Sequence, residues 1–137
     1  MTKSDLFYRL HRVEDIDAKL RCVKMKIERL ESCLQGHAIR YDTDKVQTSP
    51  QDPVAEVMAS LDKLLDQKKR LDLEMVQAVD DTAALIDALK DNRQRLILHY
   101  RYMACLPWSI VAKRVRLSDR HVFRLHDQAI DWLAKNL

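Results

Sequence analysis

Hydrophobic residues in the first third of the chain recur every three or four positions, which is the spacing of one face of an α-helix. This apolar set comprises Leu6, Leu10, Val13, Ile16, Leu20, Val23, Ile27, Leu30 and Leu34. From Val13 onward the steps alternate between three and four residues, as in the heptad seam of a coiled coil. The pattern predicts one helix from about Ser4 to Leu34, with Ser4 as its N-cap and Gly36, just past its end, as its C-cap.

A second heptad pattern occupies residues 54–89 and has two lines. One line contains Val54, Leu61, Lys68, Met75, Thr82 and Leu89, and the other contains Val57, Leu64, Leu71, Ala78 and Leu85. We expect this helix to begin at Pro53 with Asp52 as its N-cap, because proline suits the first helical position. Lys68 and Thr82 interrupt the seam. Polar residues at such positions often fix the register or the oligomeric state of a coiled coil. The alternative for Lys68 is that its side chain extends along the helix to place its ammonium group in water.

The boundaries of the two long helices leave alternatives open. The second helix either continues to about Lys90 or breaks at the acidic pair 80–81, with a separate helix from Thr82. The connector, residues 36–52, is long for a loop in a compact helical protein. It is either a floppy connection or a segment that packs along the helices with Val46 as an anchor.

Two helices of comparable length that each carry an apolar seam are expected to pack as an antiparallel, coiled-coil-like hairpin. A hairpin of two helices buries little apolar area by itself. The pattern therefore predicts a homo-oligomer, with a dimer favoured.

The run from Trp108 to Leu125 has the pattern of two short amphipathic helices joined by a turn. Its apolar residues are Ile110, Val111, Val115, Leu117, Val122 and Leu125. Ala112 provides a small side chain where the helices cross, and Ser118 is placed to cap the second helix. Arg116 opens the turn, at a position where the backbone often adopts φ > 0 and glycine is common. The run predicts a helix-turn-helix, which places its second helix in the DNA major groove; the alternative is a helical pair that only packs against the rest of the chain.

The polar residues of this run supply candidate DNA contacts. On the outward side of the second helix, Arg120, His121 and Arg124 are candidates for reading bases. Candidates for phosphate contact lie on the first helix and in the turn: Lys113, Arg114, Arg116 and Ser118. Trp108 either stacks on the sugar-phosphate or packs in the core against Tyr100, Tyr102 or Trp132. Phe123 either contacts a thymine methyl or closes the core.

The distribution of charge favours an anionic partner. Residues 92–137 contain nine basic and three acidic residues, an excess of +6, whereas the whole chain carries +3. The rest of the chain is therefore mildly acidic. A basic domain on an acidic body is typical of nucleic-acid binding, although solvated helices also carry many charges.

Signals for other chemistry are weak. The chain has one glycine, so a glycine-rich phosphate loop is excluded, and no H-E-x-x-H motif occurs. The three cysteines lack C-x-x-C spacing and are expected to be reduced and partly buried. We expect no enzymatic activity, cofactor, metal site, small-molecule substrate or membrane span. Because the start Met1–Asp5 has no apolar signal-peptide core, we expect a cytoplasmic protein.

The C-terminal third resembles region four of bacterial sigma factors. The matching segments are Asn92–Met103, Leu106–Trp108, the helix-turn-helix run and Gln128–Leu133. With Trp108, the segment Lys45–Pro50 and a helical N-terminal half, the chain is similar to short phage-encoded proteins that include ArpU-type late transcription regulators. The resemblance implies a helical domain that binds double-stranded DNA in the bacterial host cell, and a possible contact with RNA polymerase. No sigma region two is visible.

Together these features predict an all-α protein in two parts. Residues 1–81 form the helical hairpin that drives oligomerisation, with the connector at 36–52. Residues 82–137 form a small sigma-region-four-like helix-turn-helix domain. The predicted function is sequence-specific DNA binding in phage transcription control. Two alternatives remain: a DNA-packaging recognition subunit like the small terminase, and an adaptor that binds RNA polymerase or a sigma factor without gripping DNA.

Overall fold

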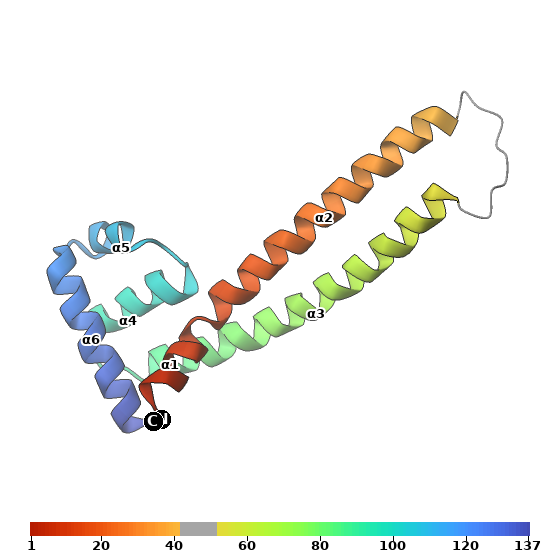
Figure 1. Cartoon of the computed structure of the whole chain (residues 1–137). Helices are drawn as coiled ribbons and strands as arrows, with labels where there is room; N and C mark the ends of the chain where they lie inside the picture. Colours follow the sequence, from red (N-terminus) through yellow and green to blue (C-terminus); the bar gives the residue numbers. More distant parts are fainter. Residues whose placement is uncertain (42–51) are drawn as a thin grey trace. The chain divides into compact units, whose positions relative to one another are not determined.

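The computed structural model describes residues 1–41 and 52–137, and within these ranges every regular element is helical (Figure 1). The elements are α1 (Lys3–Leu10), α2 (Arg12–Tyr41), α3 (Pro53–Asp87), α4 (Asn92–Leu98), the π-helical η1 (His99–Met103), α5 (Trp108–Val115) and α6 (Asp119–Asn136). The predicted all-α class is confirmed for this part of the chain. Most of the connector, including Val46 and Pro50, lies outside the described residues.

The chain divides into two compact units whose boundaries cut through the long helices. One unit contains Met1–Asp17 together with Glu74–Leu137, and the other contains Ala18–Leu73. This division differs from the predicted one at residue 81, because the N-terminal residues share a core with the C-terminal helices. Leu6 and Leu10 of α1 are fully buried in the same cluster as Leu133 of α6.

The N-terminal helix is interrupted, so the prediction of one helix from Ser4 to Leu34 is wrong. α1 begins after Thr2, whose hydroxyl accepts a hydrogen bond from the Asp5 backbone N–H at 3.1 Å, and Ser4 lies inside the helix. α1 ends at Leu10, with His11 as its C-cap, before α2 begins.

Gly36 does not end a helix, contrary to the predicted C-cap. It lies within α2, which continues to Tyr41, and it does not adopt a positive φ. A glycine inside a helix is destabilising by only about 1 kcal/mol relative to alanine. A helix of 30 residues can therefore continue through it.

α3 is continuous through the acidic pair at 80–81, so of the two alternatives the continuous helix is confirmed and the break before Thr82 is wrong. Its start is as predicted: the Val54 backbone N–H donates to the Asp52 carboxylate at 3.0 Å. The helix ends at Asp87, slightly before the predicted Lys90. No break is needed at 80–81 because both aspartates are exposed while Thr82 stays on the buried seam, 1% exposed.

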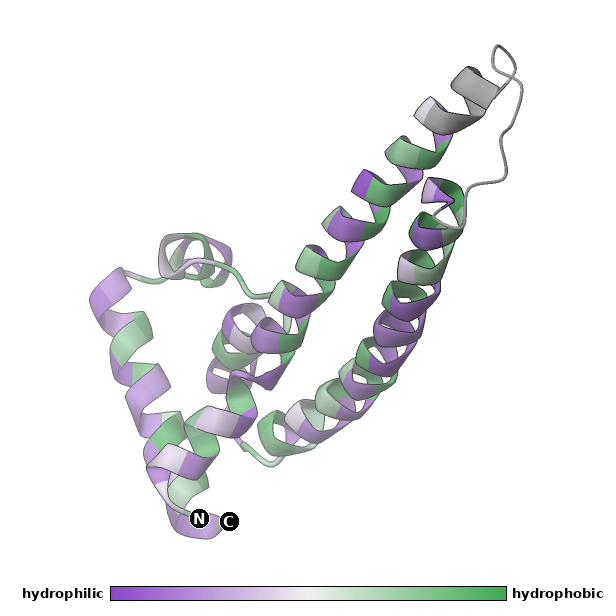
Figure 2. Ribbon diagram, turned by 45° about the vertical axis from the view of Figure 1, so that its right-hand side comes forward, coloured by the Kyte–Doolittle hydropathy of each residue, from purple (hydrophilic) through white to green (hydrophobic). Residues whose placement is uncertain are grey.

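In the unit Ala18–Leu73, segments of α2 and α3 run side by side in opposite chain directions (Figures 1 and 2). The buried residues are those of the predicted seams: Leu20, Val23, Ile27, Leu61 and Leu71. Lys68 is half-buried, and its ammonium pairs with Asp72 of its own helix at 2.9 Å, as expected for a side chain that snorkels. Cys22 and Cys33 are exposed, which corrects the prediction of partial burial. Both lie off the apolar seam of α2.

The other unit has two apolar clusters. The first joins α1, the end of α3, the α4–η1 segment and α6, and its fully buried members include Ile86, Leu98 and Ala129. The second joins α4, α5 and α6 through Ile97, Val111, Ala112, Val122 and Leu125. Two helices of this second cluster, α5 and α6, and the turn between them carry all the candidate DNA contacts.

Candidate nucleic-acid interface

α5 and α6 pack on a common core, with the side chains that the apolar pattern predicted. Val111 and Val122 are 0% and 1% exposed, and Ala112 is 5% exposed at the centre of the same cluster. Leu117, in the turn, packs against this cluster. The angle between the two helices is therefore fixed by apolar packing, which leaves their polar faces free for other contacts.

The turn between the helices is a Schellman motif with a non-glycine residue in the left-handed conformation. Arg116 has φ 58° and ψ 44°. The Leu117 N–H donates to the Ala112 carbonyl at 3.1 Å, and the Arg116 N–H donates to the Lys113 carbonyl at 3.3 Å. The predicted positive φ at Arg116 is confirmed. A residue with a Cβ is strained in this region, whereas glycine is not. Arg116 therefore adopts a backbone conformation that glycine would adopt at a lower energy.

Ser118 caps α6, as the sequence predicted. Its side chain accepts a hydrogen bond from the His121 backbone N–H at 3.2 Å. The cap starts α6 immediately after the turn, so the first turn of α6 carries Arg120 and His121. The free N–H groups and positive dipole end of this turn favour anions.

The outer face of the N-terminal half of α6 carries two exposed arginines, Arg120 and Arg124, together with the exposed acids Asp119 and Asp127. Arg120 and Arg124 are exposed, His121 is partly buried, and all three line a shallow surface hollow. Because Arg120 and Arg124 are four residues apart, their side chains lie on the same face. Hydrophilic and hydrophobic residues alternate along α6 in Figure 2, as in an amphipathic helix.

The acidic residues that line the same hollow have partners of their own. Asp131 pairs with the Lys3 ammonium at 2.6 Å, which raises the pKa of Lys3 through the hydrogen bond and the opposite charge. Asp127 lies 3.2 Å from Nδ1 of His126. Both carboxylates are therefore engaged by groups other than the arginines.

The candidate phosphate contacts surround the N-terminal end of α6. Lys113, Arg114 and Arg116 are exposed, and Ser118 is exposed beside them. Arg114 also lies over the ring of Tyr100, with its Cζ 5.7 Å from the ring centroid. Three of these residues therefore extend to solvent, whereas Arg114 is also held by a cation–π contact.

An aromatic arrangement that the sequence did not predict lies behind this face. Trp108 packs edge-on against Phe123, with centroids 5.1 Å apart, and against His126 at 4.9 Å. The predicted partners of Trp108 were other aromatic residues. No spacing rule could have indicated the observed pairs, because Trp108 and its partners lie on different helices and meet only through the turn.

His126 and Tyr102 form a buried hydrogen bond that sequence reasoning also missed. The Tyr102 hydroxyl lies 2.7 Å from Nε2 of His126. Because the Asp127 carboxylate can only accept, Nδ1 of the neutral ring carries the proton and Nε2 accepts from the Tyr102 hydroxyl. Burial raises the pKa of Tyr102 to about 12. Burial lowers the pKa of His126, against the opposing effect of the Asp127 carboxylate. The hydrogen bond joins η1 to α6, and His126 is buried.

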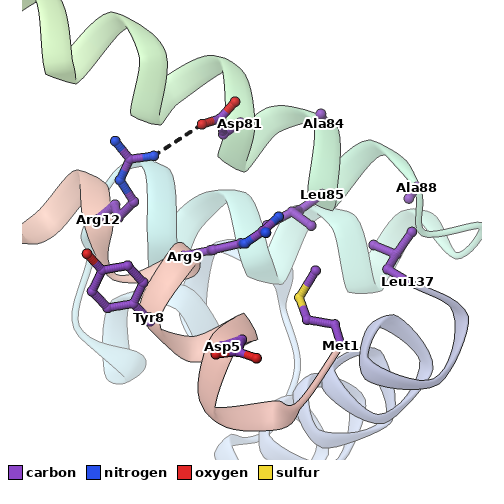
Figure 3. Close-up of a pocket in the computed structure, with 10 residues that line it drawn as sticks. All are labelled: Met1, Asp5, Tyr8, Arg9, Arg12, Asp81, Ala84, Leu85, Ala88 and Leu137. Carbon is purple, nitrogen blue, oxygen red and sulfur yellow. Dashed lines mark hydrogen bonds and ion pairs between the residues drawn. The ribbon is translucent and has the colours of Figure 1, made fainter.

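A second hollow lies between α1 and the C-terminal part of α3 (Figure 3). Apolar side chains including Leu85 and Leu137 line it, and Arg12 at its edge pairs with Asp81 at 3.1 Å. This ion pair joins α2 to α3 within one compact unit.

Among the described residues, no cluster of three or more His, Cys, Asp or Glu side chains is arranged to hold a metal ion. In residues 1–41 and 52–137, no helix combines the length and apolar character that crossing a membrane requires.

No protein family, curated protein or solved structure matches this chain.

Proposed function

We propose that this protein binds double-stranded DNA through a helix-turn-helix formed by α5, the turn at 116–118 and α6. The observation that carries the proposal is the exposure of Arg120 and Arg124 on one face of α6, directly after a capped turn. A second helix held at a fixed angle by a shared core is the arrangement that delivers side chains to the major groove. Arginine can donate two hydrogen bonds to guanine there.

In this proposal the side chains divide into two groups by their targets. Arg120, His121 and Arg124 face the bases from α6. The groups that contact phosphates are Lys113, Arg114, Arg116 and Ser118. The basic excess of +6 in residues 92–137 supports contact with phosphates, because phosphate neutralisation supplies a large share of the affinity of DNA-binding proteins.

We further propose that the α2–α3 pair acts as a helical hairpin that joins copies of the chain, most simply as a dimer. The support is apolar exposure in the unit Ala18–Leu73: Met25 is 65% exposed, Met58 47%, Leu65 45% and Leu73 72%. A dimer would present two copies of α6 to two half-sites of DNA. Equilibrium sedimentation should give twice the single-chain mass at tens of micromolar, and the mass of one chain would contradict the proposal.

The process that fits best is transcription control in a bacteriophage, inside the bacterial host cell. The phage assignment rests on the resemblance to short phage-encoded proteins of the ArpU type, and contact with RNA polymerase rests on the resemblance of residues 92–137 to sigma region four. DNA packaging and a polymerase-binding adaptor are the competing functions, and the experiment below separates them.

The decisive experiment measures binding of the purified protein to fragments of its own genome at two salt concentrations. We expect specific binding that weakens steeply with salt, because counterions are released from the phosphates. A bound promoter fragment supports transcription control, whereas a bound packaging region supports the packaging function. No binding at low salt would contradict the DNA proposal and favour the adaptor.

Two variants test the docking of α6 on the bound fragment. Arg120→Ala should weaken specific binding by about 1–3 kcal/mol and relax the sequence preference at one position. Lys113→Ala should weaken binding to all sequences alike and reduce the salt slope by about 1. Unchanged affinity in both variants would show that α6 does not enter the groove in this way.

A further inference from the structure

Phe123 is an aromatic side chain exposed on the face of α6 that carries Arg120 and Arg124. Its relative exposure is 43%, and it lines the same hollow as Arg120 and Arg124. It is not among the partly buried side chains that pack against the core of α4, α5 and α6. A single exposed apolar residue is ordinary by itself. Two features distinguish Phe123: it lies beside Arg120 and Arg124 on the same face, and its ring packs against another aromatic ring.

The Phe123 ring is restrained from behind by Trp108. The two rings meet at 5.1 Å with an interplanar angle of 62°. Trp108 is itself fixed, because the Arg101 guanidinium lies over its ring at 4.9 Å and His126 packs on it at 4.9 Å. Arg101 is anchored in turn by a hydrogen bond from Nη1 to the Leu106 carbonyl at 3.0 Å.

This support keeps an apolar surface in one orientation at the protein's outer face. A side chain that is already restricted to one orientation loses little conformational entropy when it binds a partner. In the major groove, the C5 methyl of thymine is the apolar feature that distinguishes one base edge from the others, and phenylalanine is among the side chains that contact it.

We propose that Phe123 is a specificity-determining residue that contacts a thymine methyl group, beside the bases that Arg120 and Arg124 contact. This inference rests on the proposed DNA-binding function and deepens it. Trp108 acts as a positioning residue, since its ring packs against Phe123 and restricts the orientation of that ring. The recognised site therefore contains a thymine adjacent to the bases read by the arginines.

The test replaces each thymine of the bound fragment, one at a time, with deoxyuridine, which lacks the methyl group. For the natural protein, at least one replacement should weaken binding about fourfold, the change that corresponds to burial of one methyl-sized group. In Phe123→Ala, the same replacement should have no effect, because the contact is already lost. In Phe123→Leu, which keeps an apolar side chain, part of the discrimination should remain.

Leu96→Ala is the matched control, because Leu96 is an exposed apolar residue of α4, 47% exposed. It should retain full discrimination between thymine and deoxyuridine. Equal discrimination in Phe123→Ala and the natural protein, or no discrimination at any thymine, would overturn the role of Phe123 while leaving DNA binding intact. Absence of specific DNA binding by the natural protein would overturn both proposals, so the two failures are distinguishable. Circular dichroism and thermal unfolding check that Phe123→Ala is folded.

Discussion

Replacing Arg116 by glycine should stabilise the fold and weaken DNA binding at the same time. Arg116 has φ 58° and ψ 44°, in the left-handed region, at the C-cap of α5. A residue with a Cβ in this conformation is strained by about 1–2 kcal/mol. Glycine removes this strain, but it also increases the entropy of the unfolded chain, which offsets about 0.5–1 kcal/mol.

The net expectation is a gain of about 0.5–1 kcal/mol in the free energy of unfolding for Arg116→Gly, since the strain removed exceeds the entropy added. For a chain of this size, such a gain raises Tm by about 1–4 °C. The backbone hydrogen bonds of the turn, from Leu117 to Ala112 and from Arg116 to Lys113, are made by main-chain atoms and remain available to glycine. Thermal unfolding followed by circular dichroism measures the shift.

Arg116→Ala is the matched control for this substitution. It removes the same charge but keeps a Cβ in the left-handed region, so it should leave stability close to that of the natural protein. Both variants should bind DNA more weakly, with the salt slope reduced by about 0.9, if Arg116 contacts one phosphate. Equal stability of the glycine and alanine variants would refute the strain argument, and an unchanged salt slope in both would remove Arg116 from the phosphate contacts.

Two further substitutions test the cap of α6 and the buried histidine. Ser118→Ala should lower the free energy of unfolding by about 0.5–2 kcal/mol through loss of the N-cap. Ser118→Asp should keep the cap but weaken DNA binding, because its carboxylate repels phosphate. Equal stability of the two variants in urea unfolding would argue against the cap. Because burial lowers the pKa of His126, the unfolded chain takes up a proton first as the pH falls below the ordinary histidine value. Stability should therefore be complete above about pH 6.5 and should decrease as the pH falls through the lowered pKa. Urea midpoints should fall between about pH 7.5 and pH 5 in the natural protein and fall less in His126→Gln, and parallel curves would contradict this origin of the pH dependence.

The apolar pattern along the chain determined the helical class and most of the buried faces. Alternating steps of three and four residues predicted the seam from Val13 to Ile27, and these side chains are buried. Some helix caps and a turn were also predicted correctly, because they depend on residues close together in the sequence. The caps by Asp52 and Ser118 and the left-handed turn at Arg116 involve atoms only a few positions apart in the chain.

Tertiary structure decided what depends on contacts between distant segments. α1 ends at Leu10 and packs in the same cluster as α6, a contact between distant segments that no local pattern predicts. The helices continue through Gly36 and through the acidic pair at 80–81, because propensity at one position is weak against the hydrogen bonds of a long helix.

For the candidate interface, the sequence determined which residues face outward and the tertiary structure decided how they are supported. The helical period placed Arg120 and Arg124 on one face of α6, because residues four apart lie one above the other. Trp108, Phe123 and His126 meet only after α5 and α6 have packed. Their contacts depend on the crossing of two helices, and the pattern of a single segment carries no information about that crossing.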